Sequence, residues 1–502
     1  MRRVVVNSGE RRSISATGLT VGVRPVENAQ IYRAMRVAVL LITLLLAGVT
    51  LNTATANATK KPTDPVVTII VSAAKRHKIT SADKHVWLHD WAVSERAQRR
   101  LATHHRSKAA QIVGARAIAT GLAQHHQLRV DQLPLVMSGV HATTDVMLHR
   151  GYPAREARIK LAGDAATYGF YPGWGIQIQP LFTFSEGNQL VSLNNTAGVT
   201  AIANRMLELD TSRLHYRAWE YAFPWQGAKL PWVSAMTQAT AMQFYARAWQ
   251  LTGKANYLAT AKAAMPGFQL DARDGGLMTY QGLGRWFLLY PFNPSQRILN
   301  GHLQAMIGLS DYATITGDPE ALSLVQDGIN AVVPLLSKFD TGAWSRYQYG
   351  QEADLGYHDL MTTQLNKLSN RTALQIFRDY GSKFRNYRIT PPETSVSSKT
   401  SGPGYPIHDG YRDNVRTSWF VDKHSTVRIS VVDDQDSAIR TYRGVYSRGS
   451  HSFAWDGWTG AHKIAPAGSY HLTISATDLA ANSSTTTSAT SLVIRKGTRS
   501  RR

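Results

Sequence analysis

Tyrosines between residues 290 and 358 are the side chains of this sequence best suited to chemistry. They are Tyr290, Tyr312, Tyr347, Tyr349 and Tyr357. A phenol has an ordinary pKa near ~10, so it is a rare choice for acid–base work. It does suit the movement of a weakly acidic C–H proton, such as the one beside the carboxylate of a sugar acid. Each tyrosine could equally be a packing residue whose hydroxyl is hydrogen-bonded.

Other side chains of the same stretch are candidates for holding such a substrate. Arg297 and Arg346 could pair with carboxylates or be ordinary surface charges. Trp344 and Tyr349 could stack on a sugar ring or pack inside the protein. Asn300 could bind a sugar hydroxyl or cap the helix that follows it. The sequence leaves both roles open for each of these residues.

Inversion of the carbon beside a carboxylate sets three requirements. A base lies on one face, an acid lies on the other, and cations or hydrogen-bond donors stabilise the enolate-like intermediate. No cofactor is needed. A polysaccharide lyase begins with the same proton abstraction and ends in elimination. A glycosidase needs two carboxylates across the bond that breaks, and Glu352 and Asp354 do not form a convincing pair.

Helical periodicity dominates the chain around these residues. Apolar positions at three- and four-residue steps predict helices at residues 199–209, 232–251, 254–265, 301–316, 319–337, 357–368 and 373–384. Antiparallel helix pairs in series predict a bundle, a solenoid or an (α/α) toroid over residues 136–388. In a toroid, the segments that join helices at one end line a groove. Short strands are expected near 165–195, at 176–179 and at 181–184.

The period changes to two in the last hundred residues. A Pro- and Ser-rich stretch at 389–405 predicts a linker. Strands expected at 426–432, 439–446, 452–455, 468–478 and 488–494 then predict an all-β sandwich over residues 406–496, before a basic tail at 497–502. The fold class is therefore a helical toroid-like domain followed by a β-sandwich.

Composition points to a polyanionic partner. The chain of 502 residues carries a formal net charge of +22, and its sequence pI is about 10.1. An anionic polysaccharide, nucleic acid or an acidic cell surface fits this charge, as does a general surface bias. No recognised motif supports specific nucleic-acid binding. With no cysteine in the sequence, disulfides and thiolate chemistry are excluded.

The N-terminal region predicts export. Arg33 and Arg36 precede an apolar run at 37–51, and small residues follow up to Ala58, which is the order of a secretory signal. Residues 1–58 are therefore expected to be a leader and signal peptide, with an uncleaved membrane anchor as the alternative. Residues 59–135 predict basic, histidine-rich surface helices. The spacing of His85 and His89 could suit a metal, but solvated histidines are the simpler interpretation.

Motifs around the tyrosines resemble the C-terminal domain of the D-glucuronyl C5-epimerases, which act on heparan-type glycosaminoglycans. The resemblance covers roughly residues 220–388 and is carried by Tyr290-Pro291, Asn300-Gly301, Asp340-Thr341-Gly342, Tyr347 and Tyr357-His358. It implies that Tyr290, Tyr347 and Tyr357 line an active-site groove and that Tyr357 moves a proton, with His358 as a further candidate. It implies an exported enzyme that inverts C5 of a hexuronic acid. A cell-envelope protein that only binds glycans and a polyuronate lyase remain the alternatives.

Two positions depart from the pattern of this family. The animal enzymes have a glutamate before the Tyr-Pro element, where this chain has Leu289. An arginine that follows the middle tyrosine in the family aligns with Gly350, although Arg346 is adjacent. Proton transfer could still run between two tyrosines or through His358.

The C-terminal residues resemble a second family. Trp455-Asp456-Gly457, Pro466-Ala467-Gly468-Ser469-Tyr470 and Ala476-Thr477-Asp478 are similar to the immunoglobulin-like module of flagellar hook-capping proteins. This resemblance implies a fold and says little about activity.

Overall fold

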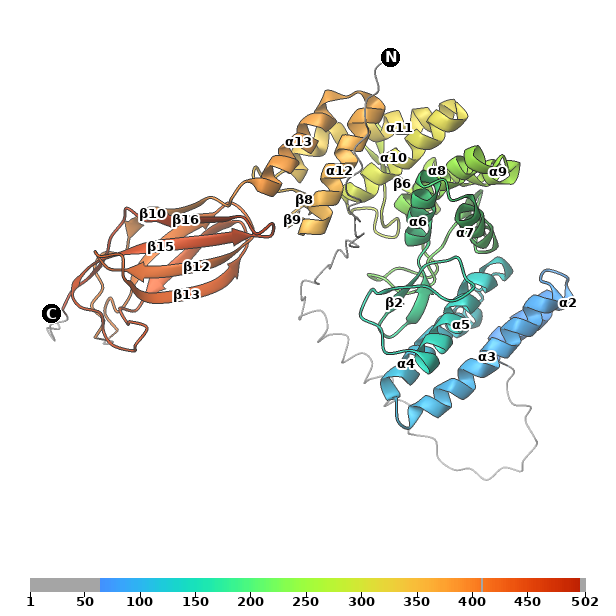
Figure 1. Cartoon of the computed structure of the whole chain (residues 1–502), viewed down its shortest axis with the longest axis horizontal. Coiled ribbons are helices and arrows are strands. Elements are labelled where there is room, and N and C mark those ends of the chain that lie inside the picture. Colours follow the sequence, from blue (N-terminus) through green and yellow to red (C-terminus); the bar gives the residue numbers. More distant parts are fainter. Residues whose placement is uncertain (1–63, 408–409, 497–502) are drawn as a thin grey trace, which may run out of the picture. The chain divides into compact units, whose positions relative to one another are not determined.

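The computed structural model describes residues 64–407 and 410–496, in which helices are followed by strands (Figure 1). This order confirms the predicted fold class. The predicted leader and signal peptide at 1–58 and the basic tail at 497–502 lie outside the described residues. Within the described ranges, no helix is both long and apolar enough to cross a membrane.

Helix pairs joined by β-hairpins form the centre of the helical part. The pairs are α6 (Pro180–Ser192) with α7 (Thr196–Glu208), α8 (Ala235–Thr252) with α9 (Ala255–Ala264), α10 (Leu299–Thr316) with α11 (Pro319–Val332), and α12 (Leu355–Thr372) with α13 (Gln375–Ile389). The hairpins between them are β4 (Thr211–Arg213) with β5 (Tyr216–Ala218), β6 (Met278–Gln281) with β7 (Gly284–Phe287), and β8 (Arg346–Gln348) with β9 (Gln351–Glu352). Each hairpin precedes α8, α10 or α12.

The first helices of the pairs form one row, because α6 contacts α8, α8 contacts α10, and α10 contacts α12. In each pair the chain runs back through the second helix. The four first helices therefore run in the same direction. Local signals set their ends. Gly317 closes α10 at a φ of 69°, and the Asp318 side chain accepts from the first-turn N–H groups of α11.

The N-terminal helices belong to the same hydrophobic core as the paired helices. They are α2 (Pro65–Lys75), α3 (Ser81–Ala102), α4 (Arg106–Gln124) and α5 (Leu133–His149). One cluster of buried residues runs from Val66 to Phe384, so the expected boundary at residue 135 is wrong. Helix α4 is not a surface helix, because Ile112, Ala115 and Ala119 on it are buried. Its alanines make close packing feasible.

A small antiparallel sheet lies between α5 and α6 in the sequence. Its strands are β1 (Arg158–Ile159), β2 (Tyr168–Tyr171) and β3 (Gly175–Ile178), and β3 contacts α4 and α5. The strand expected at 176–179 is confirmed by β3. The strand expected at 181–184 is wrong, because these residues form the first turns of α6 after Pro180. The apolar alternation there covers too few residues to separate a strand from a helix.

Two antiparallel sheets form the C-terminal sandwich. One has the order β10 (Thr394–Thr400), β11 (Val415–Val421), β14 (Gly449–Trp455). The other has the order β13 (Ala438–Tyr446), β12 (Ser425–Val432), β15 (Gly468–Asp478), β16 (Ser483–Thr487), with β17 (Leu492–Ile494) also on β15. The expected linker at 389–405 is wrong in part, because β10 lies within it and pairs with β11. Alternating serines and threonines suit an edge strand, but the same composition is typical of a linker.

Candidate active site

The predicted catalytic tyrosines lie at the ends of the helix row where the β-hairpins are. Tyr290 follows β7, Tyr347 is on β8, and Tyr357 is in the first turn of α12. The carboxylate of Asp354 caps α12 by accepting from the N–H of Tyr357 at 2.8 Å. Because the helices of the row are parallel, their N-termini point to this end. Partial positive charge there favours a bound carboxylate.

Three phenols form one contact group, which is here called the tyrosine cluster: Tyr290, Tyr347 and Tyr357. The rings of Tyr347 and Tyr357 have centroids 4.6 Å apart. The Tyr347 phenol interacts electrostatically with the phenols of both other tyrosines. The structure therefore brings together the three residues that the sequence selected from positions up to 67 apart.

The cluster is mostly buried, and burial is the main influence on its acidity. It raises the pKa of Tyr357 to about 12, whereas the interaction with Tyr347 acts in the opposite direction. Burial also raises the pKa of Tyr290, and the interaction with Tyr347 lowers it. The pKa of Tyr347 is raised the furthest. Tyr347 thus retains its proton most firmly of the three.

Residues from earlier in the chain complete this surface. Tyr171 of β2 and Tyr221 after β5 interact electrostatically with Tyr290, and Glu156 does so with Tyr290 and Tyr357. The N–H of Glu156 donates to the carbonyl of Phe170 at 3.0 Å. This hydrogen bond places Glu156 next to the strand that carries Tyr171. The sequence interpretation missed Tyr221 and Glu156. The glycine- and aromatic-rich stretch 168–175 was the one available signal for Tyr171.

Two predicted residues have structural roles instead. His358 is fully buried, its Nδ1 accepts from the Ser345 hydroxyl at 2.7 Å, and its Nε2 donates to the Phe384 carbonyl at 2.9 Å. Neither nitrogen is available to a substrate. Trp344 is 2% exposed and stacks on His358 at 3.8 Å. The assignments of His358 to proton transfer and of Trp344 to sugar stacking are therefore wrong, because both side chains fill the core below the cluster.

The predicted binding residues are divided between surface and interior. Asn300 is 2% exposed and lies inside α10 rather than at its cap, which is Ile298. The guanidinium of Arg346 donates to the carbonyls of Lys338 and Asp340, and that of Arg297 to Gln281 and Pro294. Both arginines are thus held by the protein itself. Tyr349 is exposed, and its role in stacking stays a prediction.

The remaining tyrosine of the stretch lies elsewhere. Tyr312 is in the second half of α10, and its hydroxyl is 3.4 Å from the Asp318 carboxylate at the far end of that helix. It is a packing residue outside the cluster.

Gly350, which replaces the expected arginine, lies at the turn between β8 and β9 with a φ of 76°. That backbone conformation favours glycine over arginine.

A groove with basic lining adjoins the tyrosine cluster. It has a volume of about 720 Å³, and Arg129, Arg213, Lys229, Trp232 and Phe292 contribute to its wall. The rings of Trp232 and Phe292 also contact Tyr290, with centroids 6.0 and 5.4 Å away. A further cavity of about 900 Å³ lies on another side, between α3, α5 and α7.

A buried carboxylate holds two cations of this groove in place. Glu220 has a side chain that is 0% exposed, and it pairs with Arg213 at 2.8 Å and Arg129 at 3.1 Å. Gln132 donates a further hydrogen bond at 2.8 Å. This arrangement fixes both guanidinium groups at the groove wall. The sequence interpretation missed it, because Arg129 and Gln132 lie at least 81 positions before Arg213 and Glu220.

Metal binding finds no counterpart in the described residues. His85 and His89 are exposed on α3, and His89 lies 3.6 Å from Asp90. Within ranges 64–407 and 410–496, no group of three or more histidine, aspartate or glutamate side chains is arranged to hold an ion.

Acid is expected to destabilise the helical part through two buried histidines. His302 and His358 each use Nδ1 as an acceptor and Nε2 as a donor to a carbonyl. Burial lowers the pKa of His302 to about 3 and that of His358 to about 4. The unfolded chain takes up these protons below pH ~6.5, whereas the folded chain stays neutral. Stability is therefore complete above that pH and falls towards pH 4, by up to about 1.4 kcal/mol per pH unit for each histidine.

Urea denaturation between pH 7.5 and 5 measures this slope. His358→Gln should be less stable at pH 7.5 and should show a smaller slope, because one of the two groups is gone. The exposed His462 provides the control, and His462→Gln should leave the slope unchanged. An identical slope in the His358→Gln variant would contradict the assignment.

Comparisons with known proteins agree with both resemblances found in the sequence. Residues 213–386 match the family model described as D-glucuronyl C5-epimerase C-terminus, and residues 418–479 match that of the FlgD Ig-like domain. The first match includes all three residues of the tyrosine cluster.

Related chains match over part of their length. The chain is 29% identical over 185 residues to an uncharacterised protein of Methanocaldococcus jannaschii, which is 36% of this chain and 60% of that protein. It is 29% identical over 128 residues to a D-glucuronyl C5-epimerase of Caenorhabditis elegans, which is 23% of this chain and 21% of that enzyme. The chain thus spans less than two thirds of both relatives.

Among solved structures, a GH76 α-mannanase of Bacteroides thetaiotaomicron matches with a TM-score of 0.33 and 14% identity. The match covers 46% of this chain and 66% of the mannanase.

Proposed function

We propose that this protein is a uronate C5-epimerase that acts on an anionic polysaccharide. The observation that carries the proposal is the tyrosine cluster, in which three phenols from separate segments meet. The match of residues 213–386 to the C-terminal domain of such epimerases supports it.

The reaction moves one proton and leaves the composition of the sugar unchanged. A base removes the C5 proton, and the electron pair of the broken C–H bond moves into the carboxylate as an enolate. An acid on the opposite face then returns a proton to C5. Tyr357 and Tyr290 are the two transfer groups in this proposal, since the interaction with Tyr347 favours the phenolate of each. Tyr347 keeps its proton and donates to the enolate oxygen.

The basic groove supports a polymeric and anionic substrate. Its lining carries Arg129, Arg213 and Lys229 against the single carboxylate of Asp274. Because Trp232 and Phe292 belong to both the groove and the surroundings of Tyr290, a chain lying in the groove reaches the cluster. Carboxylates of neighbouring sugars would then pair with the arginines.

Replacement of Arg213 by glutamine is expected to raise KM for a polyuronate by about 10- to 100-fold, with kcat unchanged. This is the loss expected for one charge-assisted hydrogen bond, and Arg213 does not touch the reacting carbon. Glu220 keeps Arg129 and Gln132 as partners, so the fold should persist. The matched control is Arg285→Gln, which removes a cation that pairs with Asp327 at 3.0 Å. Equal KM changes in both variants would indicate a general charge effect.

Incubation with polyuronates such as heparosan in D₂O tests the reaction itself. Deuterium at C5 in a chain of unchanged length is the expected result. New unsaturated ends would instead identify a lyase. A glycan that binds without any exchange would favour the alternative, a glycan-binding protein of the cell envelope.

Export is also a proposal, and it rests on the order of residues 33–58. Basic residues precede an apolar run at 37–51, and small residues follow it. N-terminal sequencing of protein recovered from the medium or envelope should find a start near residue 57 or 59. Protein that keeps residues 31–58 in the cytosol would contradict a signal peptide.

A further inference from the structure

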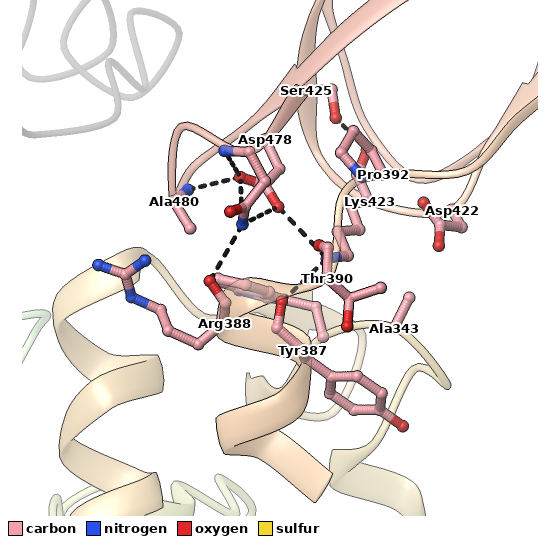
Figure 2. A network of polar contacts seen from close by, with 12 residues as sticks. Ala343, Tyr387, Arg388, Thr390, Pro392, Asp422, Lys423, Ser425, Asp478 and Ala480 are labelled. Atoms are coloured by element: carbon pink, nitrogen blue, oxygen red, sulfur yellow. Dashed lines mark hydrogen bonds and ion pairs between the residues drawn. The ribbon is translucent and has the colours of Figure 1, made fainter. Parts of the chain in front are cut away.

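A buried lysine of the sandwich lies against the end of the last helix of the helical part. Lys423, in the turn between β11 and β12, is 2% exposed. Its ammonium donates to the carbonyl of Tyr387 at 2.9 Å and to that of Thr390, and it pairs with Asp478 at 3.3 Å (Figure 2). Its three protons therefore have three acceptors, two of them from the segment that ends α13.

The partner carboxylate is fixed in the same way. Asp478 accepts from the N–H groups of Ala480 at 2.8 Å and Asn482 at 2.9 Å. The side chain of Asn482 also donates to the carbonyl of Arg388 at 3.0 Å. The hydroxyl of Ser484 donates to the carbonyl of Pro392. Because Lys423 and Asp478 are buried, this polar network is unlike the contacts of a module on a flexible tether.

From Lys423, packed side chains lead to residues that lie beside Tyr347 and Tyr357 in the sequence. The ammonium lies 5.7 Å from the ring centre of Trp344, which stacks on His358. His358 accepts from Ser345 and follows Tyr357 in the sequence. Ser345 precedes β8, which carries Tyr347.

A second contact involves the other strand of the same hairpin. The carboxylate of Glu352, at the end of β9, interacts electrostatically with the backbone of His424 and is attracted by Arg448. His424 follows Lys423, so one turn of the sandwich contacts both Trp344 and the β8–β9 hairpin. The Trp344 indole also donates to the carbonyl of Ala353 at 2.8 Å, which closes the loop between β9 and α12.

We propose that the immunoglobulin-like sandwich is a structural part of the active site, in which Lys423 is a positioning residue for Tyr347 and Tyr357. The sandwich holds residues 340–358 against the end of α13, so that the two phenols stay in contact. The role of the tyrosines rests on the proposed function, whereas the docking of the sandwich does not. An appended domain of this kind would otherwise be expected to act only as a separate binding module.

The test uses the full chain and a variant that removes the charge pair without leaving a buried carboxylate unpaired. In Lys423→Met/Asp478→Asn, hydrogen–deuterium exchange of residues 340–358 should become about 10- to 100-fold faster, as expected for the loss of charged hydrogen bonds. Exchange in β14 and α10 should stay as in the wild type. The control is Lys399→Met, which changes an exposed lysine of the same domain.

Kinetics separate positioning from general destabilisation. The double variant should lose kcat with KM within about twofold, because the groove residues are on other segments. When Tyr347→Phe is already present, the same two changes should cost less activity than in the wild type, since the part of their effect that runs through Tyr347 is then lost.

Unchanged exchange in 340–358, faster exchange throughout the chain, or additive losses of kcat would each overturn the proposal. If the wild type exchanges no C5 proton on any polyuronate, the proposed function fails and the exchange measurement still decides whether the sandwich holds this segment.

Discussion

Replacement of Tyr357 by phenylalanine is expected to lower kcat of C5 inversion by about 10²–10⁴, the usual contribution of a general acid–base group. The ring stays in contact with Tyr347, whose centroid is 4.6 Å away, and only the hydroxyl is lost. Stability should change by about 1 kcal/mol or less, because a typical hydrogen bond contributes that much. Tyr347→Phe should have a similar effect on kcat, since it removes the hydroxyl that donates to the enolate oxygen.

The pH dependence gives an independent check on the same residue. Burial raises the pKa of Tyr357 to about 12, so its phenolate is scarce at neutral pH. If the phenolate is the base, kcat/KM in the wild type should rise by about tenfold per pH unit between pH 7 and 9. This rise should be absent from the residual activity of Tyr357→Phe.

Tyr312→Phe is the matched control for both measurements. It also removes a hydroxyl from a buried tyrosine of the same stretch, but near Asp318 at the far end of α10. Its kcat should equal that of the wild type. Full activity in both Tyr347→Phe and Tyr357→Phe would return these tyrosines to a packing role.

Gly308→Ala is expected to destabilise the fold by about 2 kcal/mol, although alanine is the better helix former by ~1 kcal/mol. Gly308 lies in α10 where this helix meets α8. A Cβ there would come within 2.3 Å of the Ala239 carbonyl oxygen and 2.6 Å of its carbon. Because the obstacle is backbone, the two central helices of the row must move apart. Overpacking of this kind typically costs about 1–3 kcal/mol, and here it adds to the lost contact between the helices.

Gly121→Ala in α4 measures the effect of helix propensity alone on stability. No atom lies within 4 Å of the Cβ position there, so the same change should stabilise the protein by up to about 1 kcal/mol. Urea denaturation of the two variants side by side measures the difference. A stabilised Gly308→Ala variant would show that the contact between α8 and α10 is looser than the structure indicates.

The sequence by itself determined the periodic elements and the residues of the tyrosine cluster. Helices predicted at 232–251, 254–265 and 301–316 agree with α8, α9 and α10 to within a few residues, because long periodic runs end at clear glycine and proline signals. The strands at 426–432, 439–446 and 468–478 agree with β12, β13 and β15 for the same reason. Edge strand β10 and the start of α6 were missed, since short polar or short apolar runs fit more than one element.

Only the tertiary structure decided which of these side chains a substrate can reach. Trp344 and His358 stand beside catalytic candidates in the sequence, yet they are buried because α13 and the sandwich cover them. Arg129 pairs with Glu220 from 91 positions earlier in the chain, and Glu156 is likewise distant in sequence from the cluster near which it lies. A periodic pattern shows which residues share one face of an element. What lies against that face depends on long-range packing, which no local spacing records.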